Sequence, residues 1–303
     1  MANLSSLTYD GNLKLPAGTT AERPASPEAG QMRYNTDFKL PEYYTGRRWE
    51  TIPKISENGL ALYLDAGSEA SAPTGANGTI WKNIAPVGST PLIPDVDING
   101  RVADWSYSSD DGGVVRNTTV RNGGGIPMQL ANWEKMKGTW EFWVKWNGTS
   151  YSNGLFLNNN VTSTAIANWF WLGSYYTGGR FYIRIPDSSG SYPINFDPLM
   201  ASGRPYHVPN EWTQFVCTWD VRGGHSYFKF YVNGGVLIHQ GTLTWTVTDA
   251  NPNTEGSLML GHTNAGGAQF CGDVAIIRNY NRPLSEQEIK ANFLAGRLRY
   301  NNG

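Results

Sequence analysis

Apolar and polar residues alternate with a period of two along most of the chain after Asn58. Residues 139–146 place four large apolar side chains on one face and Glu141 and Lys145 on the other. Such alternation predicts a strand with one face on a core and one toward solvent, which makes Glu141 and Lys145 a solvent-face pair. The same pattern recurs in residues 180–186, 212–220 and 227–234. Further strand-like runs are residues 60–65, 79–84, 113–120, 165–173, 236–240, 257–261 and 273–280. About a dozen strands with no helices between them indicate an all-β sandwich.

Two short motifs locate a turn and a helix. Asn233–Gly234 lies between two strand-like runs and predicts a tight hairpin. Ser285 with Glu288 three residues later forms a capping box, which predicts one short C-terminal helix over residues 286–294. Gly296 is placed to end that helix.

The first 57 residues differ from the rest of the chain. Residues 16–30 carry three prolines among small residues and are expected to be extended. Residues 31–52 contain three short strand-like runs, which need something else to pack against because they cannot bury a core alone. We therefore expect an extended arm with a small β-module over 1–57, for attachment or oligomerisation, and the sandwich over 58–303.

Composition excludes several partners. The formal net charge is −1, so no polybasic surface is available to hold nucleic acid or an anionic membrane. No apolar run is long enough for a membrane span, and the N-terminus lacks the basic and apolar stretches of a secretory signal. Synthesis in the cytoplasm is expected. Cys217 and Cys271 lie in strand-like runs, where two buried thiols are favoured and a disulfide stays open.

The order of these strands carries a resemblance. The segments GLALYLDAG, TWEFWVKW, WTQFVCTWD, FKFYVNG, LMLG and GDVAIIRNYNRPLSEQEIKANF follow one another over residues 58–296. This order resembles the laminin-G-like branch of the concanavalin A-like lectin/glucanase domains. The resemblance implies a jelly-roll sandwich of two antiparallel sheets, one of them concave.

The N-terminal module resembles a different group. LPAGTTAERP followed by GQMRYNT and YTGRRW is similar to a short module of tail fibres and other structural proteins of tailed bacteriophages. The resemblance implies a non-enzymatic virion protein (fibre, appendage or capsid decoration), made in the host cytoplasm and partnered by capsid or tail subunits. A homo-oligomer is expected, with a trimer favoured. Aromatic side chains dominate interfaces, so the candidate anchors are Tyr34, Tyr44 and Trp49.

Glycoside hydrolases share the jelly-roll fold and must be weighed. Retaining members of the superfamily carry Glu-x-Asp-x-x-Glu on one strand, because two carboxylates must flank the scissile bond. No glutamate here is followed by aspartate two positions later. The four histidines also lack metal-ligand spacing. The sequence therefore predicts no enzyme, with a glycoside hydrolase as the third hypothesis.

The second hypothesis is a carbohydrate-binding receptor module, in which the jelly roll recognises a glycan on the host surface. Sugars stack on exposed aromatic rings beside polar groups, and four loop-like aromatic residues are candidates: Trp105, Tyr107, Tyr175 and Tyr176. Packing at a rim or a subunit interface is the alternative role for each. Asp110 and Asp111 could offer oxygen ligands to calcium, with a plain polar turn as the alternative. No other cofactor is expected.

Overall fold

A computed structural model of the chain describes residues 14–36, 40–52, 55–86, 93–99, 105–118, 126–129, 137–146, 155–160, 171–175, 180–184, 210–222, 225–243, 257–260 and 270–300. The chain divides into two compact units, Met1–Ile55 and Ser56–Gly303. The first is called the N-terminal module and the second the jelly roll.

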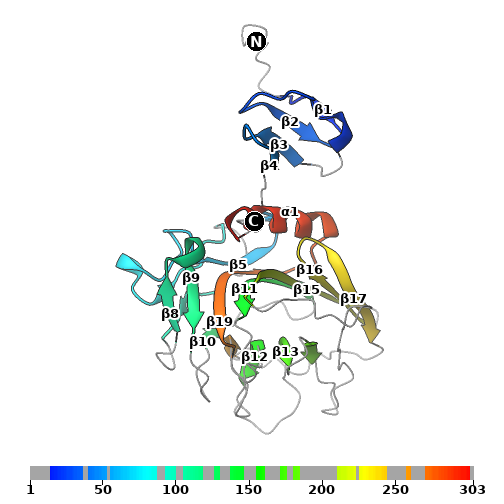
Figure 1. The fold of residues 1–303 in the computed structure, drawn as a ribbon. Coiled ribbons are helices and arrows are strands. Elements are labelled where there is room, and N and C mark those ends of the chain that lie inside the picture. The colour runs from blue at the N-terminus through cyan, green and yellow to red at the C-terminus, as the bar shows by residue number, and fades with distance from the viewer. Residues whose placement is uncertain are drawn as a thin grey trace. The chain divides into compact units, whose positions relative to one another are not determined.

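The N-terminal module is a four-stranded sheet (Figure 1). Its elements are β1 (Ala17–Gly18), the 3₁₀ helix η2 (Thr20–Glu22), β2 (Met32–Asn35), β3 (Leu40–Tyr44) and β4 (Trp49–Thr51). The strands lie in the order β1-β2-β3-β4, with β1 parallel to β2 and the other pairs antiparallel. The three strands predicted within 31–52 are thus β2, β3 and β4.

One face of this small sheet is unusual because its buried side chains are polar and charged. Arg33, Asn35 and Glu42 are all buried. Nη2 of Arg23 donates to Oε2 of Glu42 at 2.6 Å, and Nδ2 of Asn35 donates to the same oxygen at 3.1 Å. Burial raises the pKa of Glu42, but these two hydrogen bonds and the arginine charges outweigh it and hold the pKa below its usual value. An ionised carboxylate therefore organises the interior of the module.

The jelly roll consists of two large antiparallel sheets and a two-stranded ribbon. The first sheet contains β5 (Leu60–Asp65), β8 (Trp105–Ser108), β9 (Val114–Asn117), β11 (Lys137–Trp146), β15 (Trp212–Arg222), β16 (His225–Val232), β17 (Val236–Leu243) and β19 (Gly272–Tyr280). The second contains β10 (Ile126–Gln129), β12 (Leu155–Asn160), β13 (Trp171–Tyr175), β14 (Arg180–Arg184) and β18 (Ser257–Leu260). The ribbon pairs β6 (Ile80–Trp81) with β7 (Val96–Asp97), and two 3₁₀ turns are η3 (Gly75–Asn77) and η4 (Asp110–Gly112). The predicted all-β sandwich is confirmed.

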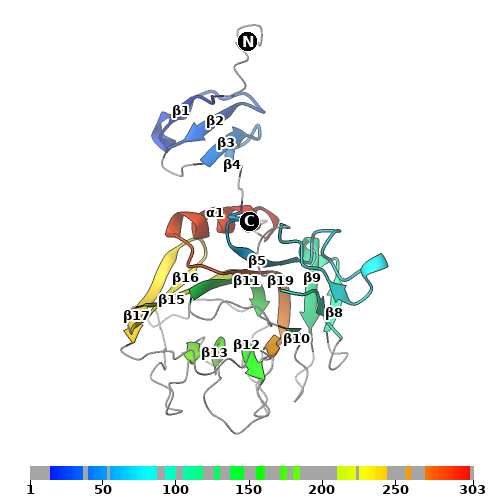
Figure 2. The ribbon, with the colours of Figure 1, turned by 180° about the vertical axis from the view of Figure 1, so that it is seen from behind.

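The strand order places β19 inside the eight-stranded sheet. That sheet runs β17-β16-β15-β11-β19-β9-β8, and β5 pairs with β19 beside β9. The five-stranded sheet runs β10-β18-β12-β13-β14. Figures 1 and 2 show the two sheets as stacked layers, with helix α1 (Glu286–Tyr300) on the side of the eight-stranded sheet away from the five-stranded one.

The core lies between the two sheets. Trp140, Phe142 and Val144 of β11 are buried in it, with Trp146 packed against it, as the alternation in 139–146 predicts. The eight-stranded sheet contributes further core residues from β15 and β16: Phe215, Cys217, Trp219, Phe228, Phe230 and Val232. Cys217 and Cys271 are both buried free thiols. Burial raises the pKa of each thiol, so neither is an activated nucleophile.

Helix α1 begins where predicted and ends later. The N–H of Ser285 donates to Oε2 of Glu288 at 2.9 Å, and the N–H of Glu288 donates back to Oγ of Ser285 at 3.3 Å, which confirms the capping box. The helix then continues past Gly296 to Tyr300, so the predicted end at residue 294 is wrong. No helix among the described residues is long and apolar enough to span a membrane.

Candidate functional site

The five-stranded sheet has one face on the core, and its register identifies the opposite face. Ile126 and Met128 of β10 are buried in the core and pair with Leu260 and Leu258 of β18. Cross-strand partners lie on the same face of a sheet, and alternate residues lie on opposite faces. The positions between them, Pro127 on β10 and Met259 on β18, therefore belong to the face opposite the core. We call this the outer face.

Three aromatic positions follow from the same register. On the outer face, Met259 pairs with Asn158 of β12, and Asn158 pairs with Trp171 of β13. Across the next pair of strands, Trp171 is opposite Arg184, Gly173 opposite Tyr182, and Tyr175 opposite Arg180. The outer face therefore contains Trp171, Tyr175, Tyr182, Arg180, Arg184 and Asn158. Aromatic, arginine and asparagine residues are the types that bind the CH faces and hydroxyls of sugars.

The structure separates the four aromatic residues predicted to bind sugar. Trp105 is only 2% exposed and stacks on Phe270 with ring centroids 6.3 Å apart, so it is a core residue and the prediction for it is corrected. Tyr107 is half-buried at the edge of the eight-stranded sheet, in β8. Tyr175 falls on the outer face by register, whereas Tyr176 lies outside the described residues. Sequence reasoning missed Trp171.

Tyr182 was also missed as a site residue, although the alternation in 180–186 set it with Arg184 against the apolar positions. That signal places a residue on a face but cannot say that β13 lies beside β14 and aligns Tyr182 with Gly173. Strand neighbours come only from the tertiary fold.

Asp110 and Asp111, the candidate calcium ligands, are paired with cations of the protein. Nη1 of Arg116 donates to Oδ2 of Asp110 at 2.7 Å, and Lys145 forms an ion pair with Asp111. Nε of Arg116 also lies 2.6 Å from Oδ1 of Asp273. Hydrogen bonds from Arg116 and Lys145 lower the pKa values of Asp110 and Asp111 respectively. In the described part of the chain no group of three or more His, Cys, Asp or Glu side chains could hold a metal ion. Asp110, Asp111 and Asp273 instead form ion pairs with Arg116 and Lys145, and we call these five residues the ion-pair cluster.

Glu141 is the clearest difference from the sequence-based prediction. Its side chain is fully buried, and Nη1 of Arg278 donates to its Oε1 at 2.7 Å. Nε2 of Gln214 reaches Oε1 at 2.9 Å, and Nδ2 of Asn292 reaches Oε2 at 2.6 Å. Lys145 instead pairs with the aspartates of the ion-pair cluster. The predicted solvent-face pair is wrong because helix α1, which carries Asn292, covers this face of the sheet.

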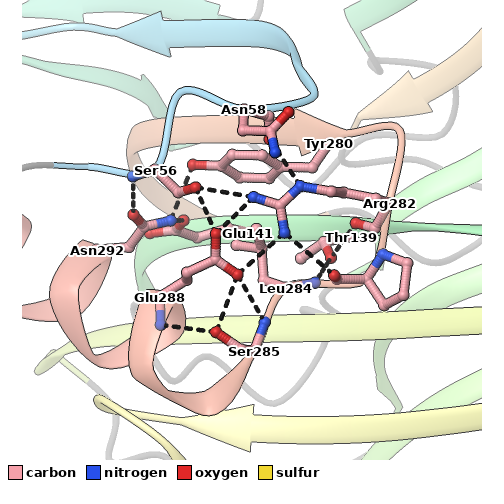
Figure 3. Close-up of polar contacts among 11 residues, drawn as sticks. Ser56, Asn58, Thr139, Glu141, Tyr280, Arg282, Leu284, Ser285, Glu288 and Asn292 are labelled. Atoms are coloured by element: carbon pink, nitrogen blue, oxygen red, sulfur yellow. Dashed lines mark hydrogen bonds and ion pairs between the residues drawn. The ribbon is translucent and has the colours of Figure 1, made fainter.

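A polar cluster fixes the chain where it enters the jelly roll (Figure 3). The N–H of Ser56 donates to Oδ1 of Asn292 at 2.9 Å, and its Oγ donates to Oε1 of Glu288 at 2.7 Å. Nη2 of Arg282 donates to Oγ of Ser56 at 3.0 Å, and Nε of Arg282 donates to the carbonyl of Asn58 at 2.9 Å. Arg282 and Glu288 also form an ion pair. We call these five residues the entry clamp.

The candidate anchors of the N-terminal module are half-buried. The rings of Tyr44 and Trp49 contact each other with centroids 5.6 Å apart, and Arg33 lies 6.0 Å from the Trp49 centroid. Tyr34 is also half-buried. Packing inside the module thus engages Tyr44 and Trp49. Among the described residues, the exposed large apolar side chains are instead Met32 (40%) and Ile52 (39%), both in this module.

Solved structures with a similar fold include domains of glycoside hydrolases. Trypanosoma rangeli sialidase matches with a TM-score of 0.53 and 16% identity over 80% of this chain and 34% of its own. Domain 4 of AbnA, a GH43 extracellular arabinanase from Geobacillus stearothermophilus solved with arabinotriose, matches with a TM-score of 0.50 and 17% identity over 78% and 98%. The chain thus spans about a third of the sialidase and nearly all of the arabinanase domain. No curated protein matches the chain by sequence.

These neighbours correct the prediction that the chain is not an enzyme. The fold occurs within a sialidase and an arabinanase, so a missing Glu-x-Asp-x-x-Glu sequence does not exclude hydrolase chemistry. At these identities the likeness establishes the fold alone. The family itself follows from sequence, because residues 121–290, more than half of the chain, match its profile. The chain belongs to the concanavalin A-like lectin/glucanase superfamily.

Proposed function

We propose that the jelly roll binds carbohydrate on the outer face of its five-stranded sheet, and that the N-terminal module attaches it to the virion of a tailed bacteriophage. The observation that carries the first part is the register that groups Trp171, Tyr175 and Tyr182 with two arginines on that face. Aromatic rings stack on sugars and arginine donors bind hydroxyl and carboxylate oxygens, so neutral and acidic host-surface glycans both suit the face.

A solved relative supports carbohydrate as the ligand. The fourth domain of AbnA has a similar fold over 98% of its length and was solved with arabinotriose. It shows that a domain of this size and architecture can hold an oligosaccharide. The sugar bound by the present chain is set by its own side chains and need not be arabinose.

The position of the chain entry supports display on a particle. Ser56 is bound to helix α1, and α1 covers the eight-stranded sheet on the side away from the five-stranded sheet (Figures 1 and 2). The point where the chain enters the jelly roll and the outer face therefore lie on opposite sides of the sandwich. A jelly roll held through its N-terminus would be free to present the outer face to a glycan.

The N-terminal module supplies the attachment in this proposal. Met32 and Ile52 are the large apolar side chains exposed among its described residues, although its interior is built around the buried Glu42. Exposed apolar groups on a small module favour docking to another protein surface. Capsid or tail subunits of the virion, and further copies of the chain, are the partners we propose.

Binding of the full chain to a panel of oligosaccharides, including arabinotriose and sialylated glycans, tests the proposal. Trp171→Ala and Tyr182→Ala should each lower affinity for the bound sugar by about 5- to 150-fold, if stacking on one ring contributes about 1–3 kcal/mol as it does for base–aromatic stacking. Tyr227→Ala is the matched control, since Tyr227 lies on β16 of the other sheet. The same mixtures are assayed for released sugar, which detects hydrolysis. No binding to any glycan, or equal losses in all three variants, would overturn the proposal.

A further inference from the structure

Ser56, the first residue of the entry clamp, precedes the first strand of the jelly roll along the chain. Strand β5 begins at Leu60, and its first ladder pair joins Leu60 to Tyr280 at the end of β19. Ser56 is four residues earlier, and its partner Arg282 follows Tyr280 by two residues. Any pull on the chain from its N-terminal side therefore meets the clamp before it meets β5.

Without the clamp, such a pull would act directly on the end of β5. Within the sheet, β5 pairs with the single strand β19 over residues 60–65. On its other edge, backbone groups of Ala61 and Tyr63 are hydrogen-bonded to residues 83, 84 and 93, which belong to no strand of the sheet. Ladder pairs pulled at one end separate one after another, so each resists the pull alone. Hydrogen bonds that join one short segment to several partners are instead loaded together, and hydrogen bonds to charged groups are roughly twice as strong as neutral ones.

In the clamp, one short segment is joined by hydrogen bonds to several partners that are loaded together. Ser56 is bonded to Asn292 and Glu288 of α1 and receives a bond from Arg282, which also holds the Asn58 carbonyl. Asn292 continues into the buried network, because its amide donates to Glu141 of β11. A pull at Ser56 is thus divided between the helix, the turn after β19 and the centre of the eight-stranded sheet (Figure 3).

We propose that the entry clamp is a mechanical anchor that keeps β5 paired when the jelly roll is pulled through its N-terminus. The inference rests on the proposed function for the origin of the tension: a chain held to a particle at one end and to a glycan at the other is stretched whenever the two move apart. The clamp then keeps the outer face folded and bound while the tether is under load.

Force spectroscopy on the full chain tests the anchor. One handle is placed at the N-terminus and the other at a cysteine introduced at the exposed Lys229 (Lys229→Cys). Ser56→Ala removes the bonds of Oγ to Glu288 and Arg282 and leaves the backbone bond to Asn292. Under constant load we expect the jelly roll of this variant to unfold at least about tenfold faster than the parent chain, because tenfold corresponds to the loss of one charge-assisted hydrogen bond and Oγ of Ser56 makes two.

Ser71→Ala is the matched control. Oγ of Ser71 also makes two hydrogen bonds, accepting from the N–H of Asp65 and donating to the Lys82 carbonyl, but it lies at the far end of β5. Each rate under load is divided by the same variant's unfolding rate in denaturant without load, which removes any general loss of stability. Acceleration specific to Ser56→Ala supports the anchor, whereas equal normalised rates for the two variants would overturn it. A chain that binds no glycan overturns the proposed function and leaves this comparison unaffected.

Discussion

Nη1 of Arg278 lies 2.7 Å from Oε1 of Glu141, and both side chains are essentially inaccessible, at 1% and 0% exposure. The pair joins β19 to β11 on the face of the eight-stranded sheet that α1 covers. Gln214 donates a second hydrogen bond to Oε1 of Glu141, and Asn292 donates one to Oε2. The carboxylate therefore ties two neighbouring strands and the C-terminal helix into one structure.

We expect Glu141→Leu to destabilise the jelly roll by about 3–5 kcal/mol, because it leaves the Arg278 charge buried without a counter-ion. The double variant Glu141→Leu, Arg278→Met should recover a large part of that loss, since it removes both charges. Urea unfolding followed by tryptophan fluorescence gives both values. A double variant no more stable than Glu141→Leu would show that the network, and not the unpaired charge, sets the cost.

Gly296 permits the close approach of α1 to the sheet. A Cβ built there would lie 2.6 Å from the indole of Trp143. Gly296→Ala gains about 1 kcal/mol of helix propensity, but overpacking typically costs about 1–3 kcal/mol, so we expect net destabilisation. Thermal unfolding measures it, with the exposed Gln287→Ala as a helix control that stays within about 0.5 kcal/mol of the parent. A rise in Tm for Gly296→Ala would contradict the packing account.

The entry clamp should make stability depend on acid pH. Hydrogen bonds from Arg282, Ser285 and Ser56 outweigh burial and lower the pKa of Glu288 from 4.5 to about 2. Because the folded pKa lies below the unfolded one, the contribution is complete above about pH 4.5 and is lost as the pH falls toward 2. The difference in unfolding free energy between the parent chain and Glu288→Gln should therefore shrink over this interval. A difference that stays constant from pH 6 to about pH 2.5 would show that Glu288 does not titrate as described.

The two units should separate by truncation. We expect residues 56–303 to fold alone with a nearly unchanged Tm, because the entry clamp and both sheets lie within this span. Light scattering should find the full chain as a defined oligomer and the truncated chain as a monomer if the N-terminal module carries self-association. Starting the chain at Asn58 instead removes Ser56 and should lower the Tm. Oligomers of the truncated chain would place the contacts on the jelly roll.

Much of the fold could be predicted because its signals are local. The alternation in residues 139–146 identifies a strand and its core face, Asn233–Gly234 marks the β16–β17 hairpin, and Ser285 with Glu288 starts the helix. Each depends on neighbours within a few residues, so the amino-acid order is enough.

The candidate site depended on contacts distant in sequence. Trp105 and Trp171 both lie in strands, yet one is buried against Phe270 and the other is assigned to the outer face by its register with Asn158 and Arg184. Nothing local distinguishes them, because burial is set by which strands become neighbours. Sequence alone therefore named aromatic candidates and could not decide which of them are buried.

The sequence by itself determined the all-β sandwich and the capped start of α1, since strand period, turn and cap chemistry are properties of adjacent residues. Tertiary structure alone decided that Glu141 is buried, that α1 passes Gly296, and that Ser56 is bound to Asn292. The physical reason is the same in each case. A polar strand face has the same pattern whether it meets water or a helix, and only the packed fold says which.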